Sequence, residues 1–132
     1  MKIYKTRWFN RWSRKQEIED LTLCNAVREI AAGLYDADLG GGLIKKRIAR
    51  PGSGKSGGFR TLLATNKGDL WIFLYGFPKS KRSNIGKDEE QQLKKSAEDL
   101  LSLAPEGIEL LKNEDELIEV DCDDEKTEIG DC

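Results

Sequence analysis

A set of cationic side chains between residues 45 and 82 carries the strongest chemical signal of the sequence. Ammonium and guanidinium groups gathered in this way are typical of proteins that bind phosphodiester groups. No carboxylate lies between Asp38 and Asp69, whereas surfaces that serve only solubility mix charges of both signs. The sequence therefore predicts contact with nucleic acid or with the ribosome. The set consists of Lys45, Lys46, Arg47, Arg50, Lys55, Arg60, Lys79, Lys81 and Arg82.

The charge of the chain is divided between its two ends. Residues 1–87 contain 18 Lys and Arg against 7 Asp and Glu, a net charge of +11. Residues 88–132 contain 4 against 17, a net charge of −13, so the total is only −2. A strongly positive segment repels itself unless it has a polyanionic partner, which again favours nucleic acid. The acidic end is expected to serve as a solubiliser, an intramolecular shield or a partner site.

Missing residue types restrict the chemistry further. The chain contains no histidine, which removes the commonest general base and the commonest metal ligand, so catalysis must use Lys, Arg, Tyr, Ser or carboxylates. We expect no metal site and no cofactor. The segment Gly54-Lys55-Ser56 has the ending of a phosphate-binding loop. The residues after it favour a strand where such a loop needs a helix, so no nucleotide cofactor is expected.

The three cysteines, Cys24, Cys122 and Cys132, are widely spaced and odd in number. This pattern indicates neither a disulfide framework nor a metal-binding pair and is typical of the reducing cytoplasm. Cys24 is expected to be a small buried hydrophobic residue, and the other two have no predicted role. No apolar run is long enough to span a membrane, and the N-terminus lacks the apolar stretch of a signal peptide. We expect a cytoplasmic protein without a membrane partner.

The spacing of apolar residues predicts an α+β domain in the order β-α-α-β-β-β-α. A short strand begins at Ile3, and Thr6 is placed to cap the first helix. The second helix covers residues 18–34. An antiparallel meander with the first strand beside it is predicted from three segments, residues 43–50, 59–65 and 70–77. A helix over 88–103 completes a domain of residues 1–104, and residues 105–132 are expected to form a short helix and an acidic, flexible tail.

Strand periodicity assigns the functional candidates to faces. In the strand 43–50, Lys46 lies on one face and Lys45 and Arg47 on the other. Most aromatic residues, including the tryptophans of the first helix, are assigned to the core because they recur at helical or strand spacing with other apolar residues. Tyr75 and Phe77 are the exceptions, since they precede a basic segment and are suited to stack on bases.

Much of the chain resembles the RelE/HigB-like toxins of bacterial type II toxin–antitoxin modules, in the RelE/ParE superfamily. The resemblance rests on the segment 36–62, which contains Gly58-Phe59-Arg60, and on Tyr75-Gly76-Phe77, and it extends from residue 2 to about residue 103. It implies a microbial-ribonuclease-type fold, with a twisted, mostly antiparallel sheet of about four strands, two N-terminal helices and a C-terminal helix. It also implies a cognate antitoxin partner and cleavage of messenger RNA on the ribosome.

The resemblance also implies roles for single residues. Arg60 matches the arginine that contacts the scissile phosphate, and Lys45 and Lys46 occupy the strand of the family's catalytic lysines. Arg82, in the basic segment after the last strand, is grouped with them as catalytic. The tyrosine that some relatives carry after this segment has no counterpart, since Gly86 stands near its place. The predicted RNA-binding residues are Arg47, Arg50, Lys55, Lys79, Lys81 and Tyr75.

These residue types suit metal-independent cleavage of RNA, in which the 2′-hydroxyl attacks the adjacent phosphate. The protein must orient the attack, remove a proton and stabilise the added charge on phosphorus. An arginine fork fits the phosphate oxygens, and a lysine crowded by other cations is suited to act as a base. Two alternatives remain open, namely a ParE-like inhibitor of DNA gyrase and a degenerate toxin that binds nucleic acid or a partner without catalysis.

Overall fold

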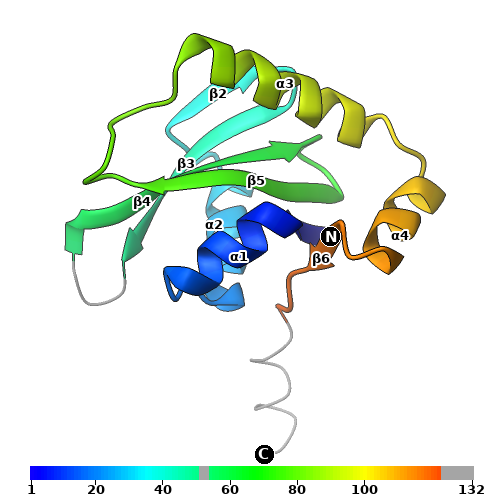
Figure 1. Ribbon diagram of the computed structural model, residues 1–132, viewed down its shortest axis with the longest axis horizontal. Coiled ribbons are helices and arrows are strands. Elements are labelled where there is room, and N and C mark those ends of the chain that lie inside the picture. The colour runs from blue at the N-terminus through cyan, green and yellow to red at the C-terminus, as the bar shows by residue number, and fades with distance from the viewer. Residues whose placement is uncertain (51–53, 123–132) are drawn as a thin grey trace, which may run out of the picture.

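The predicted α+β fold is confirmed by the structure, and the predicted order of elements matches it apart from two additional short strands. The computed structural model describes residues 1–50 and 54–122, without the side chains of residues 54–57 (Figure 1). It is an α+β fold with four helices and a six-stranded mixed sheet among the described residues. The elements in chain order are β1 (Lys2–Thr6), α1 (Arg7–Lys15), α2 (Asp20–Ala31), β2 (Ala37–Gly40), β3 (Leu43–Arg50), β4 (Gly54–Thr65), β5 (Leu70–Pro78), α3 (Lys87–Leu101), α4 (Pro105–Asn113) and β6 (Leu117–Glu119).

The sheet is built around the predicted meander. Its strand order is β2-β3-β4-β5-β1-β6, and every neighbouring pair is antiparallel except β1 and β5. The expectation that the first strand lies beside the meander is thus confirmed, with β1 parallel to β5. Two short edge strands, β2 and β6, were not anticipated from the sequence. The sheet therefore has six strands where about four were expected.

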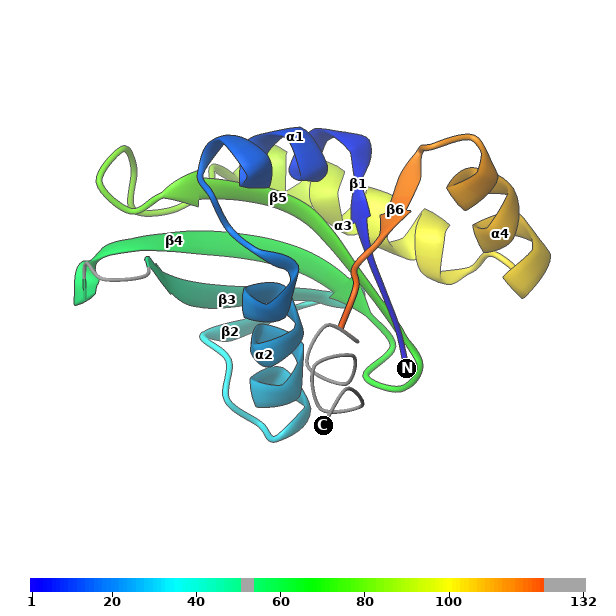
Figure 2. The ribbon, with the colours of Figure 1, turned by 90° about the horizontal axis from the view of Figure 1, so that it is seen from below.

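Helices cover both faces of the sheet, so that it has two hydrophobic cores. Figure 2 shows α2 in front of the sheet and α3 behind it. The first core joins α1 and α2 to the sheet through fully buried side chains such as Phe9, Val27 and Phe73. The second joins α3 and α4 to the other face, for example through Leu62 and Ala97. Burial on both faces explains the continuous apolar run of β5.

Local sequence fixes where α1 begins and how closely it lies against β5. Thr6 caps the helix as predicted, because its Oγ1 accepts a hydrogen bond of 3.2 Å from the backbone N–H of Phe9. The indole of Trp12 lies directly over Gly76, where an added Cβ would come within 2.4 Å of the ring. The absence of a side chain at Gly76 therefore lets α1 approach the second half of β5, beyond the end of β1.

The C-terminal part of the described chain returns to the sheet. Strand β6 pairs with β1 in antiparallel register, and Cys122, just beyond it, forms a disulfide with Cys24 of α2. The expectation of unpaired cysteines was wrong, because the two sulfurs come together through the fold across 98 residues of sequence, a separation that spacing rules do not detect. The short helix and acidic, flexible tail were predicted for residues 105–132, and of these residues 123–132 lie outside the part of the chain that the structure describes.

A polar contact lies beside this disulfide. Lys5 of β1 is nearly buried, and its Nζ is 2.8 Å from Oδ1 of Asp20 in α2. The other oxygen of Asp20 accepts a hydrogen bond of 2.8 Å from the backbone N–H of Asp121. This ion pair, this hydrogen bond and the disulfide thus help to hold together the start of α2, strand β1 and the segment after β6. Among the described residues, no helix is long and apolar enough to cross a membrane.

Candidate nucleic-acid interface

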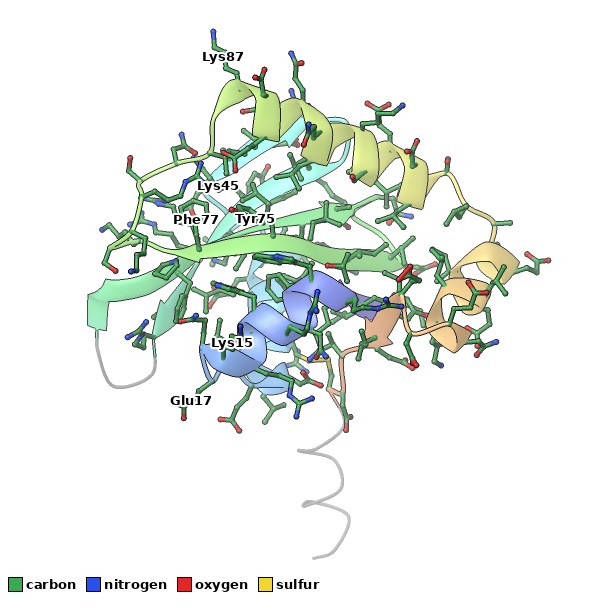
Figure 3. The ribbon with its side chains drawn as sticks, viewed as in Figure 1. Lys15, Glu17, Lys45, Tyr75, Phe77 and Lys87 are labelled. Atoms are coloured by element: carbon green, nitrogen blue, oxygen red, sulfur yellow. A yellow bond between two sulfur atoms is a disulfide. The ribbon has the colours of Figure 1, made fainter. Side chains whose placement is uncertain are left out.

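The register of the meander places cationic and aromatic side chains side by side on one face of the sheet. Arg60 in β4 is the register partner of Arg47 in β3 and of Phe77 in β5. One row further along, Leu62 is flanked by Lys45 and Tyr75. Since register partners point to the same face, these side chains share the face that α3 covers in part. Figure 3 shows Lys45, Tyr75 and Phe77 on the α3 side of β5. We call this surface the basic face and define it as Lys45, Arg47, Arg60, Tyr75, Phe77 and Arg82.

Arg60 occupies the middle of the basic face. Its side chain is half-buried on a central strand, and its Nε is buried without a hydrogen-bond acceptor among the described residues. No carboxylate of the described chain forms an ion pair with it or with Lys45. A buried donor without an acceptor is costly, and such a group in a native protein is commonly explained by a catalytic role or by a bound ion or water molecule. The guanidinium of Arg60 is thus suited to an anionic ligand.

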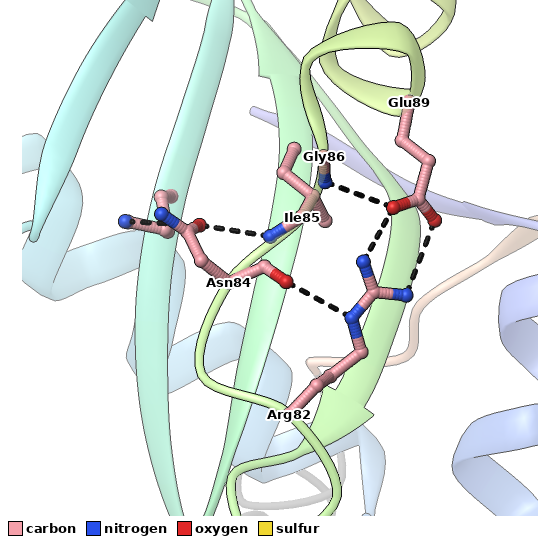
Figure 4. A network of polar contacts seen from close by, with 6 residues as sticks. Arg82, Asn84, Ile85, Gly86 and Glu89 are labelled. Carbon is pink, nitrogen blue, oxygen red and sulfur yellow. Dashed lines mark hydrogen bonds and ion pairs between the residues drawn. The ribbon is translucent and has the colours of Figure 1, made fainter.

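The loop between β5 and α3 folds back over the basic face through Asn84. The Nζ of Lys45 donates to Oδ1 of Asn84 at 3.5 Å, and the same oxygen accepts the backbone N–H of Ile85 at 2.9 Å. The backbone carbonyl of Asn84 accepts a hydrogen bond of 2.9 Å from Nε of Arg82 (Figure 4). Asn84 therefore connects a lysine on β3 to an arginine that follows β5.

Arg82 is held in place by Glu89 in the first turn of α3. Its two terminal nitrogens donate to the two carboxylate oxygens of Glu89, one of them at 3.2 Å, and Oε1 of Glu89 also accepts the backbone N–H of Gly86 at 2.9 Å (Figure 4). The guanidinium lies over the ring of Phe77, with 5.2 Å between its Cζ and the ring centroid. The hydrogen bond to Glu89 raises the pKa of Arg82, and nearby Tyr75 adds to this rise. Arg82 thus reaches the basic face as a fixed cation.

Replacing Glu89 by glutamine is expected to remove a stabilising contribution at neutral pH that disappears in acid. The hydrogen bond from Arg82 lowers the pKa of Glu89 from its ordinary value of 4.5, so the folded chain binds this proton less tightly than the unfolded chain. The contribution is complete above the unfolded pKa and is lost as the pH falls through the folded pKa. Urea midpoints of the wild type and Glu89→Gln should therefore differ at neutral pH and converge in acid. Glu106→Gln, which changes an exposed carboxylate of α4, is the matched control; equal midpoint differences for Glu89→Gln at every pH would contradict the prediction.

Lys46 lies on the opposite face from the other residues predicted to be catalytic. Its side chain is 11% exposed, and its Nζ is 2.7 Å from Oε1 of Glu29 in α2 and 3.0 Å from the carbonyl oxygen of Leu34. The physical reason is strand geometry, because consecutive residues of a strand point to opposite faces. The structure therefore brings Lys45, Arg60 and Arg82 together and leaves Lys46 out. Lys46 fastens β3 to α2 instead.

Of the RNA-binding candidates, Arg47 and Tyr75 belong to the basic face as defined above, whereas Arg50, Lys79 and Lys81 do not. Arg47 is exposed, with Nε 3.4 Å from Oδ1 of Asp36, and Arg50 lies over the ring of Phe59, 4.9 Å from its centroid, toward the α1 and α2 side. Lys79 and Arg47 both line a cavity of about 430 Å³ that is otherwise formed by α2, β3 and β4. Two further candidates contribute less: Lys81 is exposed in the turn after β5, and the side chain of Lys55 lies outside the described residues.

Three residues of this region were not found by sequence reasoning. Asn84 and Glu89 act through contacts across a loop, for which the sequence holds no recognisable signal. Trp8 was placed in the core because Trp12 follows it at helical spacing, but its side chain is 41% exposed and its ring stacks on Tyr75, with 4.8 Å between centroids. Within the described residues, no group of three or more Cys, Asp and Glu side chains is arranged to hold a metal ion.

Comparison with models of known protein families identifies a family that this chain matches. The family described as "RelE toxin of RelE / RelB toxin-antitoxin system" matches residues 1–120 of the chain. No curated protein matches at a significant level. The matched residues include all six strands of the described sheet and every residue of the basic face.

Proposed function

The chain belongs to the RelE toxin family, as the resemblance predicted, and is therefore a toxin of a toxin–antitoxin module with an antitoxin as its partner. We propose that it inhibits translation as an endoribonuclease that cleaves messenger RNA on the ribosome. The observation that carries this proposal is the convergence of Lys45, Arg60 and Arg82 from three segments of the chain onto one face. Arg60 contributes a guanidinium that has no carboxylate partner among the described residues.

The basic face supports a reaction in which RNA supplies its own nucleophile. The 2′-oxygen forms a bond to phosphorus, the bond from phosphorus to the 5′-oxygen breaks, and the products end in a 2′,3′-cyclic phosphate and a 5′-hydroxyl. Arg60 is placed to bind the non-bridging oxygens, where negative charge increases in the transition state. Lys45 and Arg82 border the same site. The ammonium group of Lys45 donates a proton to the departing 5′-oxygen, while the proton of the attacking 2′-hydroxyl is released to solvent water.

The proposal is tested by controlled expression in bacteria and by cleavage with purified ribosomes carrying a defined message. We expect growth arrest, new 5′ ends inside translated frames, and fragments that end in 2′,3′-cyclic phosphate. Cuts should require the ribosome-bound message, and the same RNA without ribosomes should remain largely intact. Supercoiling by DNA gyrase is measured in parallel.

Two outcomes would contradict the proposal. Blocked supercoiling with intact messenger RNA would identify a gyrase inhibitor of the ParE type. Tight binding to ribosomes or RNA without new ends would identify a toxin that has lost catalysis.

A further inference from the structure

We propose that Trp8 is a nucleobase-stacking residue at the border of the basic face, and that it binds a base of the RNA strand whose phosphates contact the cationic residues. This inference rests on the proposed RNA ligand, but it does not depend on cleavage. Trp8 differs from the other tryptophans in its exposure. Its side chain is 41% exposed, whereas Trp71 is 1% exposed and Trp12 packs against the first core.

The ring of Trp8 begins a row of aromatic groups that ends at a cation. Its centroid is 4.8 Å from that of Tyr75, with an angle of 30° between the planes. The rings of Tyr75 and Phe77 follow at 6.1 Å, and the guanidinium of Arg82 lies 5.2 Å from the ring of Phe77. Arg60 is the register partner of Phe77 on the neighbouring strand. The row thus runs along the cations that are suited to bind phosphate.

A surface on which aromatic and cationic groups alternate is suited to bind single-stranded RNA. Each base offers a flat face that stacks on an indole, while the backbone follows a positively charged groove. Arg11 adds to this match, because it lies one helical turn after Trp8 and is exposed. An exposed tryptophan between cations fits this ligand better than it fits an apolar protein surface, which would leave the neighbouring charges desolvated.

The position of Trp8 is fixed before any ligand binds. Thr6 caps the start of the helix two residues before Trp8. Trp12, one turn after Trp8, lies in a near-parallel stack with it, at 6.0 Å and 12°. Trp12 is itself seated on Gly76. A rigid aromatic group loses little conformational entropy on binding, which makes Trp8 an efficient binding residue.

The test uses the full-length protein and two probes of equal length, a mixed-sequence 2′-O-methyl oligoribonucleotide and its abasic counterpart. Neither probe can be cleaved, because neither has a free 2′-hydroxyl. Trp8→Ala is expected to weaken binding of the base-carrying probe by about 5- to 100-fold and to leave binding of the abasic probe unchanged. Arg60→Ala should weaken binding of both probes. Leu110→Ala, at an exposed apolar position on α4, is the control and should change neither.

A second measurement does not depend on the stability of the alanine variant. The base-carrying probe should quench part of the tryptophan fluorescence of the wild type, and this quenching should vanish in Trp8→Phe, which retains an aromatic ring. Equal loss of affinity for both probes in Trp8→Ala, no loss at all, unchanged quenching in Trp8→Phe, or no binding by the wild type would each overturn the inference. Because neither probe reports cleavage, a failure of the nuclease proposal is seen separately, in the ribosome assay.

Discussion

Replacing Arg60 by alanine is expected to lower the rate of messenger RNA cleavage by about 10²- to 10³-fold, the usual effect of removing one donor that stabilises transition-state charge. Arg60 lies at the centre of the basic face, between Arg47 and Phe77, and no other described residue accepts a hydrogen bond from its Nε. Lys45 and Arg82 would remain in place, since neither is hydrogen-bonded to Arg60. The variant should therefore keep its fold and lose most of its cleavage activity.

The measurement is single-turnover cleavage of a message on purified ribosomes, with toxin in excess. Arg28→Ala is the matched control, because Arg28 is exposed on α2, on the opposite face, and its side chain donates a hydrogen bond of 2.9 Å to Asn25 of its own helix. The control should cleave like the wild type. A rate for Arg60→Ala within a few-fold of the wild type would remove Arg60 from the catalytic site.

The stability of a second variant at position 60 tests the role of Arg60 independently of its effect on cleavage. Because its Nε is buried without an acceptor in the described chain, methionine at this position should keep the packing and remove the unsatisfied donor. Arg60→Met is thus expected to be as inactive as the alanine variant and about as stable as the wild type or more stable. A trade of stability for function is common where polar groups are kept for a ligand.

Replacing Cys122 by serine is expected to lower the free energy of unfolding by about 2–4 kcal/mol under oxidising conditions. The disulfide to Cys24 closes a loop across 98 residues of sequence, and a cross-link over such a distance strongly restricts the unfolded chain. Cys122 is the better position to change, because Cys24 is fully buried. A serine at position 24 would add a buried hydroxyl to the loss of the cross-link.

Urea denaturation with and without a thiol reductant measures this effect. The wild type in reductant should unfold at the same urea concentration as Cys122→Ser, and the reductant should leave the variant unchanged. Cys132→Ser is the matched control and should behave like the wild type in both buffers. A wild type whose midpoint does not respond to reductant would contradict the prediction.

The meander and its faces followed from sequence because the relevant signals are local. Period-2 alternation placed Lys45 and Arg47 on one face of β3 and Lys46 on the other, and the structure has this arrangement. The same rule places the side chains of Lys45 and Lys46 on opposite faces of the sheet, so they cannot contact the same ligand. The family resemblance had grouped them, and strand geometry divides them.

Other features depend on contacts that a single sequence does not display. The disulfide joins residues 98 positions apart. Strand β6 consists of only the three residues Leu117–Glu119, which is too short for a recognisable alternation of apolar and polar residues. Strand β1 pairs only with the first part of β5, so α1 lies beside the rest of β5 and the ring of Trp8 stacks on Tyr75 there. Helical spacing with Trp12 reports which residues share a helix face, but it does not report how much of that face is covered.

The place of β1 in the sheet has a consequence for synthesis of the chain. The first strand made, Lys2–Thr6, lies between β5 and β6, which are made last among the strands. A nascent polypeptide must therefore hold its N-terminal segment unpaired until most of the sequence has emerged, which makes this a fold of high contact order. Tyr75, Phe77 and Arg82 also belong to the later part. A translation product that ends before them consequently lacks three of the six residues of the basic face as well as strand β6.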